Sequence, residues 1–271
     1  SLSMTCRTRD GTGSGWAAAT EHRLESLDPA ALARRAADKA DLSQNPEPVD
    51  PGTYTVVLEP QAVAELLLFL GWFLDQRSAD EGRSTFAKPG GGTRVGESLF
   101  HPSITLRSDP TAADHPSAPF ADDGQPLVPT TWIEKGVLKT LSASRYWAKK
   151  QGRAPLPRPA SIFLDGTTVS DEDLVHGVDE GILVTRFWYN RMLQRQTILA
   201  TGLTRDGTFL IKGGKISRSV KNLRYNESPL TMLKNVLALG TPRRVAIDGR
   251  MVVVPAMVVG GFTFSSLSDA V

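Results

Sequence analysis

The segment Thr201–Val220 constrains the fold more than any other part of the chain, because its pattern is that of short antiparallel strands joined by tight turns. It reads TGLTRDGTFLIKGGKISRSV. Asp-Gly and Gly-Gly pairs accept the positive φ angles of two-residue hairpin turns at little steric cost. We therefore predict two turns and three successive strands. The turns are expected at Asp206-Gly207 and Gly213-Gly214, and the strands at Gln196–Leu203, Thr208–Lys212 and Lys215–Val220.

A second segment, Pro60–Leu74, predicts a helix that is apolar on nearly every side. Proline suits the first turn of a helix. Five aliphatic residues follow at the i, i+3, i+4, i+7 and i+11 spacing of one helix face, namely Val63, Leu66, Leu67, Leu70 and Leu74. Leu68, Phe69 and Trp72 make the other face apolar too. Such a helix is expected to be buried or to face a partner.

The remaining elements favour an α+β class, because antiparallel strands and separate helices do not alternate regularly. We expect mainly antiparallel sheets, forming a partial barrel, with flanking helices. Predicted helices start at Asp28-Pro29 and at the capping pattern Ser170-Asp171-Glu172-Asp173, and cover Ser142–Lys150 and Ser228–Leu239. Predicted strands cover Thr53–Leu58, Ser98–Arg107, Ile182–Tyr189 and Val252–Phe264, with a hairpin over Thr131–Lys139. Gln44–Gly52, Asp80–Thr93 and Ser108–Pro129 read as a linker, a mobile loop and an irregular segment with five prolines.

Composition indicates the kind of environment in which the chain is found. Its 271 residues, 40% of them hydrophobic, can bury a sizeable core. A formal net charge of +2 gives no overall field for nucleic acid or an anionic membrane. The single cysteine, Cys6, agrees with a reducing compartment. The longest apolar run, Ala62–Leu74, is shorter than the roughly 20 residues of a membrane span. With no signal peptide visible, we expect a cytoplasmic protein without a membrane partner.

Five segments resemble one known family in sequence and in order. Besides Thr201–Val220 they are RDGTGSGW at Arg9–Trp16, PGTYTVVLEPQAVAELL at Pro51–Leu67, GESLFHPSITLRSDP at Gly96–Pro110 and NLRYNESPL at Asn222–Leu230. Together they span nearly the whole chain. They are similar to the C-terminal region of the TldD/TldE (PmbA) family, long labelled modulators of DNA gyrase and now regarded as two-subunit metallopeptidases.

The resemblance implies a zinc site that this sequence does not complete. Catalytic subunits of the family carry HExxxH on a helix and a distant cysteine. Here the corresponding residues run from Ala64 through Glu65 to Phe69, and the segment from Gly240 to Pro255 has no cysteine. Zinc needs three or four N, S or O donors at about 2.0–2.3 Å. By resemblance, Glu65 stands where the catalytic subunits have their general base, but without a metal-bound water it has nothing to deprotonate. Glu65 alone cannot hold the metal, so we name no catalytic, metal-binding or cofactor-binding residue and expect no cofactor. The sequence leaves one alternative open, a metal held by ligands that come together only in the folded chain.

By resemblance, the chain looks like the metal-free TldE/PmbA-type subunit of a peptidase that degrades or processes unfolded peptides. Its partner would be a metal-bearing TldD-type subunit or a second copy of itself. We expect residues 1–45 to be the end of a preceding region with a helical linker, and 46–271 to form the C-terminal domain. The hairpin-rich region Ile182–Val220 is a reasonable place for peptide or partner pairing at a sheet edge.

Two other function classes compete with this interpretation. A stand-alone hydrolase on the same scaffold would use loop carboxylates, with Asp109, Asp122, Asp123 or Glu134 in acid–base roles. A purely structural dimerisation module would bind no catalytic relative at all.

The remaining motifs are weak. The four histidines, His22, His101, His115 and His176, have no His or Cys at metal-ligand spacing. Gly13-Ser14-Gly15 lacks the nucleophile-elbow spacing, and Gly90-Gly91-Gly92 lacks the Walker order. A basic cluster, Arg145, Lys149, Lys150 and Arg153 around Tyr146 and Trp147, could bind phosphates and stack bases. A solvated helix face with its aromatics turned inward explains it better, and we expect no nucleic-acid partner.

Overall fold

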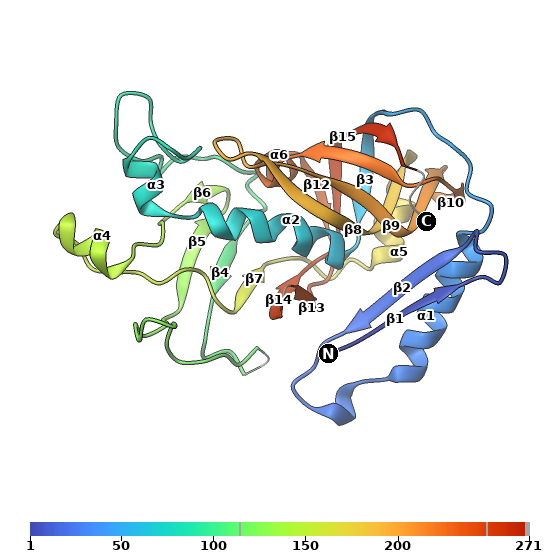
Figure 1. Cartoon of the computed structure of the whole chain (residues 1–271), viewed down its shortest axis with the longest axis horizontal. Coiled ribbons are helices and arrows are strands. Elements are labelled where there is room, and N and C mark those ends of the chain that lie inside the picture. Colours follow the sequence, from blue (N-terminus) through green and yellow to red (C-terminus); the bar gives the residue numbers. More distant parts are fainter. Residues whose placement is uncertain (114, 248, 269–271) are drawn as a thin grey trace.

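The apolar helix α2 (Pro60–Phe73) lies at the centre of the fold. In the computed structural model, which describes residues 1–113, 115–247 and 249–268, its core-facing side chains Val63, Leu66 and Leu70 are fully buried. Figure 1 shows the helix between a strongly curved sheet and a second, smaller one. The predicted buried helix is confirmed, although Trp72 near its C-terminal end is exposed.

The larger sheet has seven strands, five of which pair in a ring. Its strands are β3 (Gly52–Leu58), β8 (Glu180–Gln194), β9 (Leu199–Lys212), β10 (Lys215–Ser219), β11 (Leu223–Glu227), β12 (Val236–Leu239) and β15 (Met257–Leu267). The ring runs β3-β8-β9-β11-β15 and back to β3, and only the β3–β8 pair is parallel. The predicted α+β fold with a partial barrel is therefore confirmed.

The second sheet has six strands in the order β13-β14-β7-β4-β5-β6. They are β4 (Leu106–Ser108), β5 (Thr130–Glu134), β6 (Val137–Leu138), β7 (Ile162–Leu164), β13 (Arg243–Ile247) and β14 (Arg250–Val254). Strands β13 and β14 pack against α2 from the side opposite the ring. One core cluster of buried apolar side chains joins α2 to both sheets.

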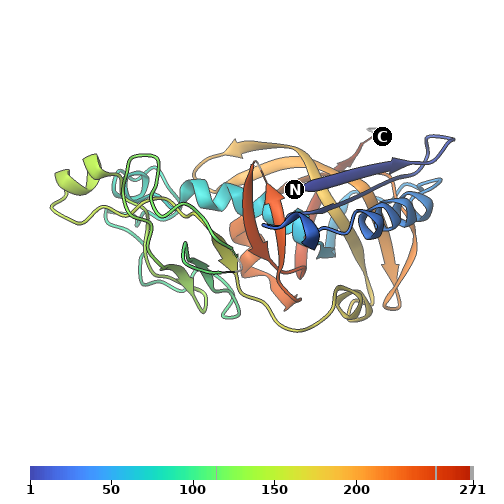
Figure 2. The ribbon, with the colours of Figure 1, turned by 90° about the horizontal axis from the view of Figure 1, so that it is seen from below.

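A small unit at the N-terminus lies at one end of the molecule. The hairpin of β1 (Leu2–Arg7) and β2 (Ser14–Ala19) packs on α1 (Pro29–Leu42), after a short 3-10 turn η1 (Leu24–Ser26). Asp28 caps α1 by accepting a hydrogen bond from the backbone N–H of Ala31, as the sequence predicts. Figures 1 and 2 place this unit opposite the short helices α3 (Gln76–Asp80) and α4 (Arg145–Lys150).

Two further short helices flank the sheets, and one corrects a prediction. Helix α5 (Asp171–His176) begins at the predicted Ser170 cap. Helix α6 (Pro229–Lys234) is much shorter than the predicted Ser228–Leu239. The last residues of that range form β12 instead, because Val236 and Leu239 pair with β15. Pairing with a distant strand has overridden the local helical pattern.

The Asp206-Gly207 pair is not a hairpin turn, which is the second correction. Strand β9 runs straight through it, paired with β8 on both sides of a bulge. Asp206 and Gly207 both have positive φ, at +54° and +123°. A bulge uses the same backbone freedom as a turn. The Gly213-Gly214 turn is confirmed and joins β9 to β10.

The third correction concerns the predicted strand at Ser98–Arg107. Only β4, at its end, is a strand. Leu99 and Phe100 both donate backbone hydrogen bonds to the carbonyl of Gly136, and Ile104 closes a turn on His101. Pro102 has no backbone N–H to donate to a neighbouring strand. The segment before β4 therefore forms turns instead of the predicted strand.

We expect the bulge to be sensitive to any side chain at Gly207. A Cβ built there lies 2.7 Å from Thr185 Oγ1, and the φ of +123° suits only glycine. Gly207→Ala should lower the free energy of unfolding by about 2 kcal/mol in urea denaturation. Gly213→Ala is the matched control, because its Cβ meets open space and its φ of +55° costs only about 1 kcal/mol. Equal losses in both variants would contradict this account.

Candidate functional site

Glu65 is a buried carboxyl group in the middle of α2. Strand β3 pairs with β8 only as far as Leu58 and Val184, after which the chain turns into the helix. Beyond that point the Glu65 Oε2 atom accepts a hydrogen bond from the backbone N–H of Phe187 on β8. Its Oε1 accepts one from Gln61 Nε2 at 3.0 Å. The side chain thus satisfies a backbone donor that β3 no longer reaches.

Burial governs the charge of Glu65. Loss of hydration raises the pKa of this carboxyl to about 8, although the hydrogen bonds from Gln61 and Phe187 and the charge of Arg186 act in the opposite direction. Glu65 therefore holds its proton at neutral pH. A group that is already protonated is a poor general base. Its geometry and its pKa both describe a structural role at the helix–strand contact.

A second polar group lies on the neighbouring strands and joins them to the N-terminal unit. Arg186 on β8 forms an ion pair with Asp206 on β9, with 3.2 Å between Nε and Oδ2. Ser14 donates its hydroxyl proton to Asp206 Oδ1 at 2.6 Å. The guanidinium of Arg186 also stacks on Trp16, 4.9 Å from the ring centroid. The sequence pattern did not reveal this contact because it predicts a hairpin turn at Asp206-Gly207.

The family resemblance implies a metal site where α2 meets β13 and β14, and the structure contains this contact. The side chains there do not supply the donors that zinc needs. Strands β13 and β14 meet α2, and Gln61 Nε2 lies 3.4 Å from the Ala246 carbonyl. Ala64 and Phe69 are buried hydrocarbon side chains, and the facing positions carry Ile247 and Val252. Within residues 1–113, 115–247 and 249–268, no three His, Cys, Asp or Glu side chains are grouped so as to hold a metal ion.

In that place the structure has a small cavity of about 80 Å³, which we call the α2 cavity. One wall is the face of α2 that carries Ala64, Leu67, Leu68, Gly71 and Trp72. The opposite wall and the rim come from Ile162 on β7, the segment Arg158-Pro159, Ile247 on β13, and Arg250 and Val252 on β14. The cavity is apolar except for the two arginines.

The structure brings two of the four histidines together. The rings of His22 and His115 stack with 6.5 Å between their centroids, and His115 is buried against Phe163. His101 is exposed and bonds Ser103 through Nδ1, and His176 is exposed at the end of α5. The His22–His115 contact joins residues far apart in sequence, so spacing along the chain could not reveal it.

The carboxylates considered for acid–base roles make only local contacts. Asp109 accepts hydrogen bonds from Thr111, which lower its pKa. Asp123 accepts them from Gln125, and this side chain lowers the pKa of Asp123. Glu134 forms an ion pair with Lys139 across its hairpin. These contacts shape loops, and Asp122 is exposed in the same irregular segment.

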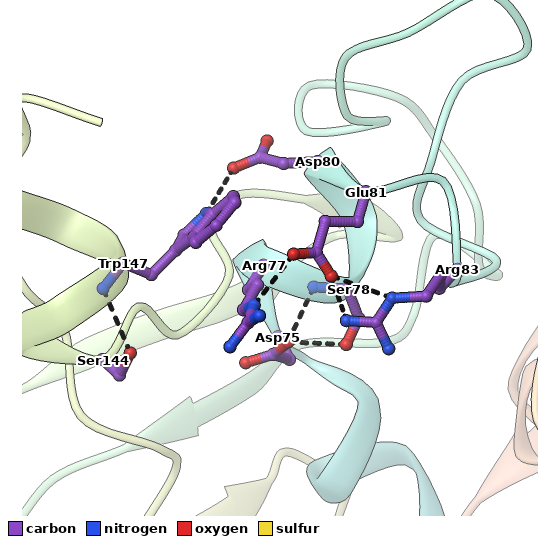
Figure 3. Close-up of polar contacts among 8 residues, drawn as sticks. All are labelled: Asp75, Arg77, Ser78, Asp80, Glu81, Arg83, Ser144 and Trp147. Carbon is purple, nitrogen blue, oxygen red and sulfur yellow. Dashed lines mark hydrogen bonds and ion pairs between the residues drawn. The ribbon is translucent and has the colours of Figure 1, made fainter. Parts of the chain in front are cut away.

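Part of the basic cluster around α4, the side chain of Trp147, is packed inside the protein. Figure 3 shows Trp147 pointing toward α3, where its Nε1 donates to Asp80 at 2.8 Å. Arg77 and Lys150 lie over the same ring, each 5.2 Å from its centroid. Trp147 is therefore buried and occupied, as expected for a helix face with inward aromatics. Tyr146 differs from that expectation, because 66% of it is exposed.

Within Ile182–Val220, the outer side of strand β10 is one sheet edge at which a peptide or partner could pair. Strands β8 and β9 pair with each other along most of their length. Strand β10 ends the sheet order and pairs only with β9 among the described strands. At the end of β10 the carbonyl of Ser219 already accepts a hydrogen bond from the backbone N–H of Glu47. The edge that β10 leaves for a peptide is therefore Lys215–Arg218.

The raised pKa of Glu65 predicts a pH dependence of stability. Between its ordinary value of 4.5 and the folded value of about 8, the folded chain binds one more proton than the unfolded chain. Stability must therefore fall as pH rises, by at most about 1.4 kcal/mol per pH unit. Glu65→Gln keeps an acceptor for Phe187 and has no proton to lose, so its free energy of unfolding should fall less between pH 5 and pH 8.

Urea denaturation at several pH values measures this difference. Asp123→Asn, on an exposed loop, is the control and should keep the wild-type slope. Parallel slopes for the wild type and Glu65→Gln would show that Glu65 is ionised in the folded protein.

Comparisons with known proteins show which proteins this chain is similar to. Two curated archaeal relatives are named metalloproteases. The one from Methanothermobacter thermautotrophicus is 23% identical over 239 residues, covering 83% of this chain and 51% of the relative. The one from Archaeoglobus fulgidus is 26% identical over 157 residues, covering 53% and 36%. The chain thus spans about half the length, or less, of these relatives.

A solved structure and a family model complete the comparison. The crystal structure of TldE from Thermococcus kodakarensis matches with a TM-score of 0.81 over 97% of this chain and 61% of that one, and at 18% identity this likeness shows the fold alone. The model of the PmbA/TldA metallopeptidase C-terminal domain matches residues 51–266. The chain therefore belongs to the PmbA/TldA, or TldD/TldE-type, metallopeptidase family.

Proposed function

We propose that this chain is a non-catalytic, TldE/PmbA-like subunit of a TldD/TldE-type metallopeptidase that processes or degrades unfolded peptides. The observation that carries the proposal is the metal-site position on α2. Ala64 and Phe69 stand at the two ligand positions, and Glu65 accepts hydrogen bonds from Phe187 and Gln61. The facing side chains Ile247 and Val252 are aliphatic. Hydrocarbon groups supply no ligand for zinc.

The partner is a metal-bearing TldD-type subunit, or else a second copy of this chain. We place the complex in the cytoplasm. Among the described residues, no helix combines the length and apolarity that a membrane crossing requires. Unfolded peptide would pair with the open edge of β10 through backbone hydrogen bonds.

We further propose that residues 1–45 are the end of a preceding region and that 46–271 form the C-terminal domain. The N-terminal unit has its own small core, in which Ala17, Leu32 and Ala36 are buried. It meets the larger part through polar contacts such as the Lys39–Glu59 ion pair at 2.6 Å. A separate core with a polar contact surface is typical of units that belong to different domains.

The first test is the metal content of the purified chain after exposure to zinc and removal of loosely bound ions. We expect near-zero zinc, because α2 offers a single acid where a site needs three or four donors. A purified family member that carries HExxxH is the positive control and should retain about one zinc per chain. One tightly bound zinc in this chain would contradict the proposal.

The second test is reconstitution with that HExxxH-bearing family member and a fluorogenic unfolded peptide. This chain alone should give no hydrolysis, and it should co-purify with the metal-bearing chain and support cleavage by it. Hydrolysis by this chain alone, persisting in a chelator, would favour the stand-alone hydrolase. Failure to bind the metal-bearing chain would favour the dimerisation module.

A further inference from the structure

The α2 cavity has the form of a pocket for one aliphatic side chain. Its volume of about 80 Å³ is close to that of two or three water molecules in the liquid. The walls carry aliphatic groups from α2, β7, β13 and β14, including Leu67, Ile162, Ile247 and Val252. Such walls cannot hydrogen-bond water, so filling the space with hydrocarbon is favourable.

Gly71 keeps this space open at a cost to the helix. Glycine in a helix interior is destabilising by roughly 0.5–1 kcal/mol relative to alanine. No close approach requires it here, because a Cβ at Gly71 would meet only Ile162 Cδ1, at an ordinary contact distance of 3.9 Å. A larger residue at this position would project into the cavity. The glycine is thus explained by the cavity better than by packing.

Two arginines from distant parts of the chain line the cavity. Arg158 lies in the sequence Pro157-Arg158-Pro159, where the prolines restrict the backbone, and Arg250 begins β14. Both line the cavity and both are exposed. Neither is in an ion pair or a side-chain hydrogen bond with any residue that the structure describes. Two such guanidinium groups beside an apolar pocket favour an anionic group attached to a hydrocarbon.

We propose that the α2 cavity binds the C-terminal end of a peptide whose last residue has a branched aliphatic side chain. The side chain fills the cavity, and the terminal carboxylate lies between Arg158 and Arg250. This inference rests on the proposed peptide-handling function and adds a substrate feature to it. At a peptide C-terminus the carboxylate and the side chain are attached to the same Cα, which matches an apolar pocket with cations at its rim.

The test uses the whole chain and three synthetic probes in isothermal titration calorimetry. The first is a hexapeptide ending in Leu with a free carboxylate, the second is the same peptide as its C-terminal amide, and the third is 4-methylpentanoate. We expect the free-acid peptide to bind at least tenfold more tightly than either other probe. Equal binding of the amide would overturn the carboxylate contact, and equal binding of 4-methylpentanoate would overturn the choice of a peptide.

Variants locate the site. Arg158→Gln and Arg250→Gln should each weaken binding of the free-acid peptide about tenfold. Arg153→Gln removes an exposed arginine outside the cavity and should leave binding unchanged. Gly71→Leu should abolish binding by filling the space, and Gly71→Ala should reduce it less while stabilising the helix. Circular dichroism checks that each variant is folded. Unchanged binding in a folded Gly71→Leu variant would overturn the proposal.

The outcomes separate this inference from the function on which it rests. The calorimetry uses neither a metal nor a partner chain. Zinc in the chain together with carboxylate-dependent binding would remove the non-catalytic assignment and leave the cavity site. A metal-free chain that supports a catalytic partner but does not bind the free-acid peptide would leave the non-catalytic assignment and remove the cavity site.

Discussion

The burial of α2 is the constraint on which the rest of the structure depends. A helix with apolar side chains on nearly all sides is stable in water only when other elements cover it. The ring of strands covers one side and β13 and β14 cover the other, while α6 contacts it as well. Strands that precede and follow α2 in the sequence therefore pack around one helix. The same packing gives the helix a position in which a metal site could be assembled.

Glu65 shows how one residue type serves different chemistry in different surroundings. The family resemblance gives this position to a general base, which needs a metal-bound water to act on. Here the carboxyl is buried, its pKa is raised, and its oxygens accept hydrogen bonds from Phe187 and Gln61. An unpaired backbone N–H in the core costs about as much as a lost hydrogen bond. The hydrogen bond that Glu65 accepts from the backbone N–H of Phe187 thus explains this buried carboxyl group without any catalytic role.

The sheet corrections and the missed polar contacts have one physical origin. Asp206-Gly207 has the local chemistry of a turn, and it forms a bulge because β8 is long enough to pair on both sides of it. That bulge directs Asp206 to Arg186 and Ser14. Residues Val236–Leu239 are a strand because β15 is available to pair with them. In both cases the paired residues lie outside the short segment that carries the local pattern.

The sequence by itself determined the elements whose signals are local: the apolar helix after Pro60, the caps at Asp28 and Ser170, and the turn at Gly213-Gly214. It also determined that α2 carries too few zinc donors, because side-chain chemistry does not depend on folding. Only the tertiary structure decided which apolar faces meet, how Glu65 is used, and that Arg158 and Arg250 share the rim of one cavity. Those outcomes depend on contacts between residues far apart in the chain, and periodicity and spacing carry no record of such contacts.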